Sequence, residues 1–228
     1  SKARTDVHHT GWPVQGNDEY HGSVSFVPKG IFHRKEAHQR RDTKLNEDME
    51  HYIGHPPYAE EETIMERGTY LFLDTLGIEY ETVRHKAAFT MDDCAEVEKE
   101  LGVPACKNLF LCNRQQTQFY LLMLPGKKIF KTKFLSSELG CARLSFADES
   151  HMTEMLGLHP GAVSPMGLIN DRKGNVLLLI DRELQAFEWF GCHPCVNTAT
   201  LKLRMDDVLG KIVPATGHTY KIIELKTE

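Results

Sequence analysis

Between about Tyr58 and the C-terminus, short strand patterns alternate with short helix patterns, and this alternation limits the possible folds most strongly. Apolar runs at Asn108–Cys112 and Gln118–Leu124 flank a polar turn, which predicts an antiparallel hairpin. Gly167–Ile169 and Val176–Ile180 flank the turn-forming segment NDRKGN, which predicts a second hairpin. Because purely parallel β-α-β winding contains no hairpins, we expect an α/β (α+β) fold with a mixed or barrel-like β-sheet surrounded by short helices.

Several helix limits are also marked in the sequence. Thr90 and Asp93 have the spacing of a capping box, which predicts a helix that ends at Gly102. A helical pattern across Glu60–Leu76 ends at Gly77 in the same way. We therefore expect both helices to lie against the sheet, each closed by a glycine.

Residues 1–58 differ in composition from the rest of the chain. They hold seven of the twelve histidines, a Gly/Pro/Asn-rich opening and a highly charged stretch with few apolar positions. The pairs His8/His9 and His33/His38 lack cysteine or carboxylate partners at a metal-site spacing, so we expect neither a metal nor another cofactor. The predicted organisation is an N-terminal extension over residues 1–58 and one folded domain over residues 59–228.

Composition limits the partners and the cellular compartment. No apolar run approaches the roughly 20 residues of a membrane span, and the first residues lack the apolar region of a signal peptide. The six cysteines are scattered, so we expect reduced thiols and a cytoplasmic location, with no membrane partner. The formal net charge of −5 argues against a protein that coats DNA or other nucleic acid, although a local basic patch is compatible with it.

Several common catalytic motifs are missing from the sequence. It contains no G-x-S-x-G elbow, no P-loop, no G-x-G-x-x-G and no H-E-x-x-H. A catalytic site in this chain must therefore be built from less conspicuous residues.

The segment CHPC at residues 192–195 has three possible interpretations. A redox dithiol belongs at a helix N-terminus in a thioredoxin-like unit, whereas this motif lies late in the chain between strand-like segments. A zinc site needs a second close pair, but Cys106 and Cys112 are separated by five residues. We favour the third interpretation, in which His193 and Asn197 form a polar corner of a pocket, with a buried structural histidine as its competitor.

Two other segments contain candidate contacts for a ligand, one through a lysine side chain and one through its backbone. Lys107 stands at the entry of an apolar strand, where an ammonium group can hold an anionic or carbonyl oxygen if it faces a cleft; a solvated surface lysine is the alternative. Gly161–Pro165 permits close approach of backbone to a ligand, although an ordinary connecting loop has the same composition. His193, Asn197 and Thr200 are spaced so that they can share one hydrogen-bond network.

Five motifs taken together resemble a known family. KNLFL, RLSFAD, G-x-x-x-P-x-G-L-I-N-D, HP-x-x-N-x-x-T and TGH-x-Y, in this order, are similar to the YbaK/ProX superfamily of aminoacyl-tRNA editing domains, over about residues 60–228. The motifs look most like those of the free-standing ProX proteins, which deacylate Ala-tRNA(Pro). The resemblance implies a trans-editing deacylase in which water attacks the ester without a metal or a covalent nucleophile.

The same resemblance implies a substrate and leaves alternatives. The substrate would be the acceptor end of tRNA(Pro) carrying a mischarged small amino acid, with prolyl-tRNA synthetase as a possible partner. A Cys-tRNA or Ser-tRNA deacylase of the same fold is an alternative substrate assignment. A module of this fold that binds an amino acid or nucleotide without catalysis is an alternative function.

By similarity to the family, site residues can be assigned in two groups. The residues expected to act on the ester are Lys107, Gly161 and His193. The residues expected to line the aminoacyl pocket are Ala162, Val163, Ser164, Pro165, Met166, Gly167, Asn197 and Thr200.

A short basic run follows the second predicted strand and is a candidate contact for tRNA. Its members are close in sequence, and a solvated charged face is the alternative interpretation. The run consists of Lys127, Lys128, Lys131 and Lys133.

Overall fold

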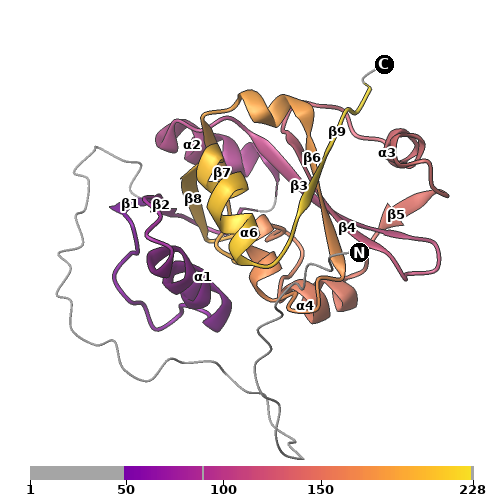
Figure 1. The fold of residues 1–228 in the computed structure, drawn as a ribbon. Helices are drawn as coiled ribbons and strands as arrows, with labels where there is room; N and C mark the ends of the chain where they lie inside the picture. Colours follow the sequence, from indigo (N-terminus) through magenta and orange to yellow (C-terminus); the bar gives the residue numbers. More distant parts are fainter. Residues whose placement is uncertain (1–48, 89, 227–228) are drawn as a thin grey trace, which may run out of the picture. The chain divides into compact units, whose positions relative to one another are not determined.

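The computed structural model describes residues 49–88 and 90–226, which form two β-sheets with helices packed around them (Figure 1). The first sheet has the strand order β1-β2-β8-β7, and every neighbouring pair is antiparallel. Its strands are β1 (Glu50–Ile53), β2 (Glu81–Arg84), β7 (Trp189–Cys192) and β8 (Ala199–Arg204).

The second sheet is mixed and has the order β5-β3-β4-β6-β9. β3 pairs antiparallel with β4 and β5, which confirms the first predicted hairpin, whereas β6 pairs parallel with β4 and β9. The mixed α/β fold expected from the sequence is therefore confirmed. The strands are β3 (Cys106–Asn113), β4 (Phe119–Pro125), β5 (Leu144–Phe146), β6 (Val176–Asp181) and β9 (Tyr220–Ile223).

The second predicted hairpin is wrong. Gly167–Ile169 belongs to a short 3₁₀ helix, η1 (Pro165–Ile169), and not to a strand. Ser164 caps this helix by accepting a hydrogen bond from the Met166 amide, and Pro165 at the first position favours helical backbone. β6 instead finds its two partners far away in sequence, in parallel pairings that a local turn pattern cannot reveal.

The helices begin and end where local signals place them. The capping box of Thr90 and Asp93 is present at the start of α2, and Gly102 ends that helix in left-handed backbone conformation. α1 begins four residues later than the sequence pattern suggested, because Thr63 caps it by accepting from the Glu66 amide. The helices are α1 (Ile64–Thr75), α2 (Met91–Leu101), α3 (Thr132–Leu139), α4 (Glu149–Leu156), η2 (Arg182–Ala186), α5 (Met205–Asp207), η3 (Val208–Ile212) and α6 (Val213–Ala215).

The fold includes residues that precede the predicted boundary at residue 58. β1 lies within the first 58 residues and pairs with β2 along its whole length, from Glu50 with Arg84 to Ile53 with Glu81. The sheet therefore begins before the predicted boundary. The histidine pairs His8/His9 and His33/His38 lie outside the described residues.

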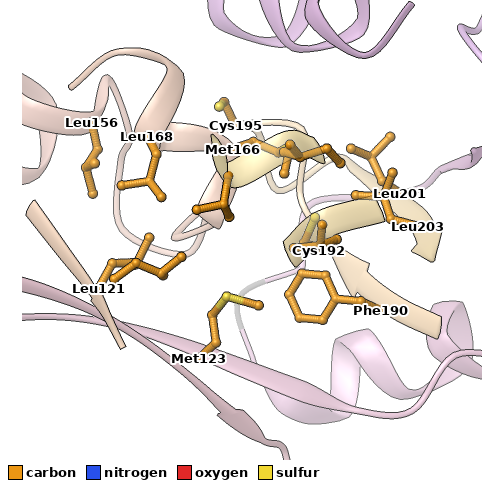
Figure 2. Close-up of a cluster of buried hydrophobic side chains, with 14 of the residues drawn as sticks. Leu121, Met123, Leu156, Met166, Leu168, Phe190, Cys192, Cys195, Leu201 and Leu203 are labelled. Carbon is orange, nitrogen blue, oxygen red and sulfur yellow. The ribbon is translucent and has the colours of Figure 1, made fainter. Parts of the chain in front are cut away.

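The main hydrophobic core lies between the two sheets (Figure 2). Leu121 and Met123 of β4 contribute from the second sheet, and Phe190 and Leu203 from the first, all fully buried. A separate cluster covers the opposite face of the second sheet, where α3 packs. In the described part of the chain, no helix is both long and apolar enough to cross a membrane.

The two cores determine which way the side chains of β3 point. Phe110 belongs to the core between the sheets, and Leu109 and Leu111 belong to the cluster on the other face. Because side chains alternate along a strand, Asn108 shares the inner face with Phe110, whereas Lys107 shares the outer face with Leu109.

Candidate active site

The loop from Gly161 to Gly167 has a shape that depends on glycine at both ends. Gly161 has φ +87°, a backbone conformation that side chains with a Cβ rarely adopt. At Gly167 a Cβ atom would lie 2.7 Å from Leu158 Cδ1 and 3.1 Å from Leu156 Cβ, so the backbone packs directly on two leucines. The loop is therefore held close to the core, with Ala162 and residues 164–168 buried.

This loop lies against the CHPC segment. The Ser164 hydroxyl, which accepts from the Met166 amide, also lies close enough to the Cys192 thiol to oppose the rise of its pKa. Met166, Cys192 and Cys195 lie in the same buried cluster (Figure 2). Two segments that the sequence suggested separately are thus in direct contact.

The thiols of this region are protonated at neutral pH. Burial raises the pKa of Cys195 to about 11 and that of Cys106 to about 12, and it raises the pKa of Cys192 further. A reactive dithiol needs a lowered pKa, so this environment disfavours the redox interpretation. Within residues 49–88 and 90–226, no group of three His, Cys, Asp or Glu side chains is arranged to hold a metal ion.

His193 takes part in a polar network with Thr200 and a second histidine that the sequence did not single out. Its Nδ1 lies 2.8 Å from the Ala199 carbonyl, and the Thr200 Oγ1 lies 2.9 Å from His85 Nε2. Carbonyl oxygens only accept, and His85 Nδ1 also faces one, that of Lys86 at 2.7 Å. Nδ1 therefore carries the proton on both rings, and the Thr200 hydroxyl donates to His85.

Both imidazoles are neutral in this environment. Burial lowers the pKa of His193, and the neighbouring His85 lowers it further, with ring centroids 6.2 Å apart. Burial also lowers the pKa of His85. A neutral His193 with its proton on Nδ1 offers Nε2 as a hydrogen-bond acceptor.

Asn197 serves mainly to position neighbouring backbone. Its side-chain Nδ2 donates to the Ala88 carbonyl at 3.2 Å, and its main-chain carbonyl accepts from the Ala88 amide at 2.9 Å. These bonds join the segment after β2, which carries His85, to the CHPC segment. The predicted network of His193, Asn197 and Thr200 is therefore two adjacent networks, with Asn197 in the supporting one.

Lys107 is half-buried, and its ammonium group has a definite partner. Its Nζ donates to the main-chain carbonyl of Lys128 at 2.9 Å. The side chain of Lys128 is buried and forms ion pairs with Asp181 at 2.9 Å and Glu183 at 2.7 Å. Burial alone would lower the pKa of Lys128, but hydrogen bonds to Glu183 and Asp181 outweigh it and raise that pKa.

The burial of Lys128 corrects the expectation of four surface lysines. Lys127, Lys131 and Lys133 are exposed, whereas Lys128 is 7% exposed and its charge is already neutralised by two carboxylates. It is therefore not available to a phosphate group. The candidate contact for tRNA is reduced to the other three.

No hydrogen bond joins Lys107 to the 161–167 loop or to His193 among the described residues. The preceding residue links the two regions, because the Gly191 amide of β7, next to Cys192, is close enough to the Cys106 thiol to oppose the rise of its pKa. β3 and the strand that leads to His193 are thus neighbours. The thiol itself donates to the Pro104 carbonyl.

Asn108 and Glu98 are two further residues of this region that the sequence did not mark. Asn108 Oδ1 is buried and has no hydrogen-bond partner within the described part of the chain, an arrangement that costs stability unless a ligand donates to it. The carboxyl of Glu98 on α2 is close enough to the Cys106 thiol to affect its pKa, and burial raises the pKa of Glu98 to about 7. A polar residue inside the apolar KNLFL strand was the available signal for Asn108.

The motif that contains the 161–167 loop is joined to the TGH segment near the C-terminus by a buried pair of side chains, Asp171 and His218. His218 of the TGH segment lies 3.0 Å from Asp171 through Nε2, and both side chains are buried. Asp171 also accepts from the Val176 amide at 2.7 Å. Burial would raise the pKa of Asp171, but the hydrogen bonds from His218 and from backbone amides outweigh it and lower that pKa. These contacts join η1, β6 and β9.

Residues 85–210 match the family of the aminoacyl-tRNA editing domain. The chain belongs to that family. Over 153 residues it is 36% identical to the prolyl-tRNA editing protein ProX of Acetoanaerobium sticklandii, a match that covers 67% of this chain and 93% of that protein. It is 30% identical over 154 residues to prolyl-tRNA synthetase associated domain-containing protein 1 of Danio rerio, covering 67% and 83%.

Solved structures share the fold. A candidate trans-editing enzyme for prolyl-tRNA synthetase superposes with a TM-score of 0.53 at 15% identity, over 72% of this chain and 99% of that one. Editing of an aminoacyl-tRNA is hydrolysis of its ester bond. As a member of this family, the chain is an aminoacyl-tRNA deacylase, a hydrolase that acts on ester bonds.

Proposed function

We propose that this protein is a trans-editing deacylase that hydrolyses Ala-tRNA(Pro). The observation that carries the proposal is the contact of the 161–167 loop with the segment of His193, through Ser164 and Cys192, in a chain similar to ProX. The contact brings the loop, with its terminal glycines, and the segment that carries the neutral His193 against one buried apolar cluster.

The loop supplies candidate donors for the carbonyl oxygen of the ester. The amides of Ala162, Met166 and Gly167 are already bound to His159, Ser164 Oγ and the Ser164 carbonyl. Among the described residues this leaves the amides of Gly161, Val163 and Ser164 as donors. One well-placed donor to a developing oxyanion contributes about 3 kcal/mol to catalysis.

The polar side chains have distinct roles in this mechanism. The buried, unpartnered Oδ1 of Asn108 accepts from the α-ammonium of the aminoacyl group. His193 Nε2 accepts from the 2′-hydroxyl of the terminal ribose, which helps to orient the attacking water. The Lys107 ammonium, on the opposite face of β3 from Asn108, leaves the Lys128 carbonyl and holds the terminal phosphate.

Selectivity follows from the size of the aminoacyl group. A synthetase pocket for proline cannot strongly exclude the smaller alanine, because lost methylene groups are each worth only about 1–3 kcal/mol. A second site that admits alanine and excludes proline corrects this error. Cysteine and serine are close to alanine in size, so their esters are the proper competitors in a test.

The experiment compares hydrolysis of Ala-, Cys-, Ser- and Pro-tRNA(Pro) by the wild type, by Lys107→Ala and by the control Lys221→Ala, which removes an exposed ammonium group from β9. We expect the wild type to hydrolyse the alanyl ester selectively. This activity should persist in Lys221→Ala and fall at least ten-fold in Lys107→Ala. Preferred hydrolysis of the cysteinyl or seryl ester would contradict the substrate. No turnover of any ester would contradict the activity and favour a binding module.

A further inference from the structure

An open hollow of about 640 Å³ lies at the edge of the second sheet, away from the residues described above. It borders β5, which pairs with β3 on one side only. No acidic side chain lines it. Its lining residues are Arg114, Thr132, Arg143, Leu144, Ser145 and Phe146.

Two arginines give the lining of the hollow positive charge. Arg114 and Arg143 are exposed, and no ion pair to either is found within residues 49–88 and 90–226. Lys131 and Lys133 flank the lining residue Thr132 at the start of α3 and are also exposed. Arginine guanidinium groups placed in this way suit phosphate oxygens.

An exposed aromatic ring lies within the same surface. Phe146 is 60% exposed although it is a large apolar residue, and its ring meets that of Phe130 edge to face at 6.2 Å. Ile129, which directly precedes Phe130, is also 64% exposed. Aromatic rings beside basic residues are typical of surfaces that bind RNA, because unpaired bases stack on them.

The surface is joined to the candidate active site by β3. Lys107 lies at the beginning of this strand, and β5 pairs with its far end, Asn113 with Leu144. At about 3.3 Å per residue, Lys107 and Asn113 are roughly 20 Å apart. Lys127 is exposed next to Lys128, whose carbonyl binds Lys107. The basic run continues through Lys131 and Lys133, on either side of Thr132, which lines the hollow.

We propose that this surface binds the acceptor stem of the substrate tRNA while its aminoacylated end occupies the site near Lys107. We call it the β5 basic surface, and it consists of Arg114, Arg143 and Phe146 with Lys127, Lys131 and Lys133. The arginines and lysines contact phosphates, and Phe146 stacks on an unpaired base. The inference rests on the proposed function and adds the location of the nucleic acid.

An RNA backbone fits this surface better than a second copy of the chain or an added strand. Two copies that meet through it would bring like charges together, which opposes association. β5 is only three residues long, so it offers little edge for a further strand. The hollow is open to solvent, as a polymer that lies across it requires.

The test uses a double variant, Arg114→Glu with Arg143→Glu, and two substrates. One substrate is full-length Ala-tRNA(Pro), and the other is the alanyl ester of the trinucleotide CCA, which has no stem. We expect kcat/KM on tRNA to fall at least ten-fold, mainly through a rise in KM, and to depend less on salt. Hydrolysis of the alanyl ester of CCA should be unchanged. Phe146→Ala lowers kcat/KM on tRNA about ten-fold without changing the salt dependence.

The control variant, Lys211→Glu with Lys221→Glu, makes the same change in net charge at two exposed lysines, one on η3 and one on β9. Unchanged tRNA kinetics in the arginine variant, or a loss of equal size in the control, would overturn the proposal. An equal loss on the trinucleotide would overturn it too, because that substrate has no stem. A wild-type dimer that the variant dissociates, with tRNA binding unchanged, would assign the surface to self-association instead.

The deacylase activity and the β5 basic surface can be contradicted independently of each other. If the wild type hydrolyses no ester, the proposed function fails, and the surface is still tested by binding of uncharged tRNA(Pro) in fluorescence anisotropy. If the wild type hydrolyses Ala-tRNA(Pro) but the arginine variant does so equally well, only the surface fails.

Discussion

Lys107 donates a 2.9 Å hydrogen bond to the main-chain carbonyl of Lys128, and Lys128 is in turn fixed by its buried ion pair with Asp181. One lysine thus positions another through backbone, with a carboxylate 53 residues further along as the anchor. The buried ion pair thus fixes the Lys128 carbonyl, and with it the Lys107 ammonium group that the proposed chemistry needs.

The Lys128–Asp181 pair makes a prediction about stability. Removing one partner of a buried ion pair leaves an uncompensated charge, which costs about 3–5 kcal/mol. Lys128→Met should therefore lower the free energy of unfolding in urea by about this amount. Lys127→Met, at an exposed neighbour, should change it little.

The double variant Lys128→Met with Asp181→Leu separates charge from packing. It should be more stable than either single variant, because neither charge is left buried alone. Additive losses in the double variant would show that the two residues contribute by packing and not as a pair.

Much of the fold could be predicted because its signals are local. The capping box of Thr90 and Asp93 located α2, and the apolar runs around Asn113–Thr117 located the β3–β4 hairpin. The segment at Gly167–Ile169 was misassigned as a strand because the partners of β6 are parallel and distant. Parallel pairing leaves no turn motif between neighbouring strands.

The site was less accessible to sequence reasoning. Lys128 looks like its neighbours Lys127 and Lys131 in a basic run, and only the distant Asp181 shows that it is buried. His85 has no motif of its own, since its partner Thr200 lies 115 residues away. The loop and His193 were predicted as site residues from similarity to a family, which carries long-range information that composition lacks, and their roles stay a prediction.

The two half-buried histidines of the candidate site, His85 and His193, predict a loss of stability in mild acid. Their pKa values are lowered from the ordinary 6.5, so the folded state resists protonation more than the unfolded chain does. Their contribution is complete above pH 6.5 and is lost as the pH falls below it toward the folded-state pKa. The melting temperature should therefore decline between pH 7 and pH 5, by roughly several degrees per kcal/mol lost.

Variants at these histidines test the cause of that decline. His85→Gln cannot gain a proton, so its melting temperature should fall less steeply with acidification than that of the wild type. His159→Gln removes a histidine that is 71% exposed in its side chain and should leave the slope unchanged. Equal slopes in all three proteins would exclude His85 as a source.

Glu98 predicts a change in the opposite direction. Its pKa is raised by burial from 4.5 to about 7, so the folded state binds the proton more tightly than the unfolded chain. The contribution is present below pH 4.5 and is lost as the pH rises through about 7. Glu98→Gln should raise the melting temperature at pH 8 and change it little at pH 5.

The matched control for Glu98 is an exposed carboxylate on the same helix. Glu96→Gln removes the same charge from α2 at an exposed position and should not show a pH-dependent gain. If both variants shift the melting temperature equally at both pH values, the effect comes from net charge and the burial argument is wrong.

Gly161 predicts a coupled loss of stability and activity. Its φ of +87° is unfavourable for any residue with a Cβ, so Gly161→Ala should cost about 1–2 kcal/mol of stability. Because the strain is relieved by moving the backbone that presents the Gly161, Val163 and Ser164 amides, kcat/KM for Ala-tRNA(Pro) should fall at least ten-fold. Gly174→Ala is the matched control, since Gly174 has φ +65° and no atom within 4 Å of an added Cβ. It should lose similar stability with full activity, whereas equal activity losses would mean that general destabilisation and not the loop amides limits hydrolysis.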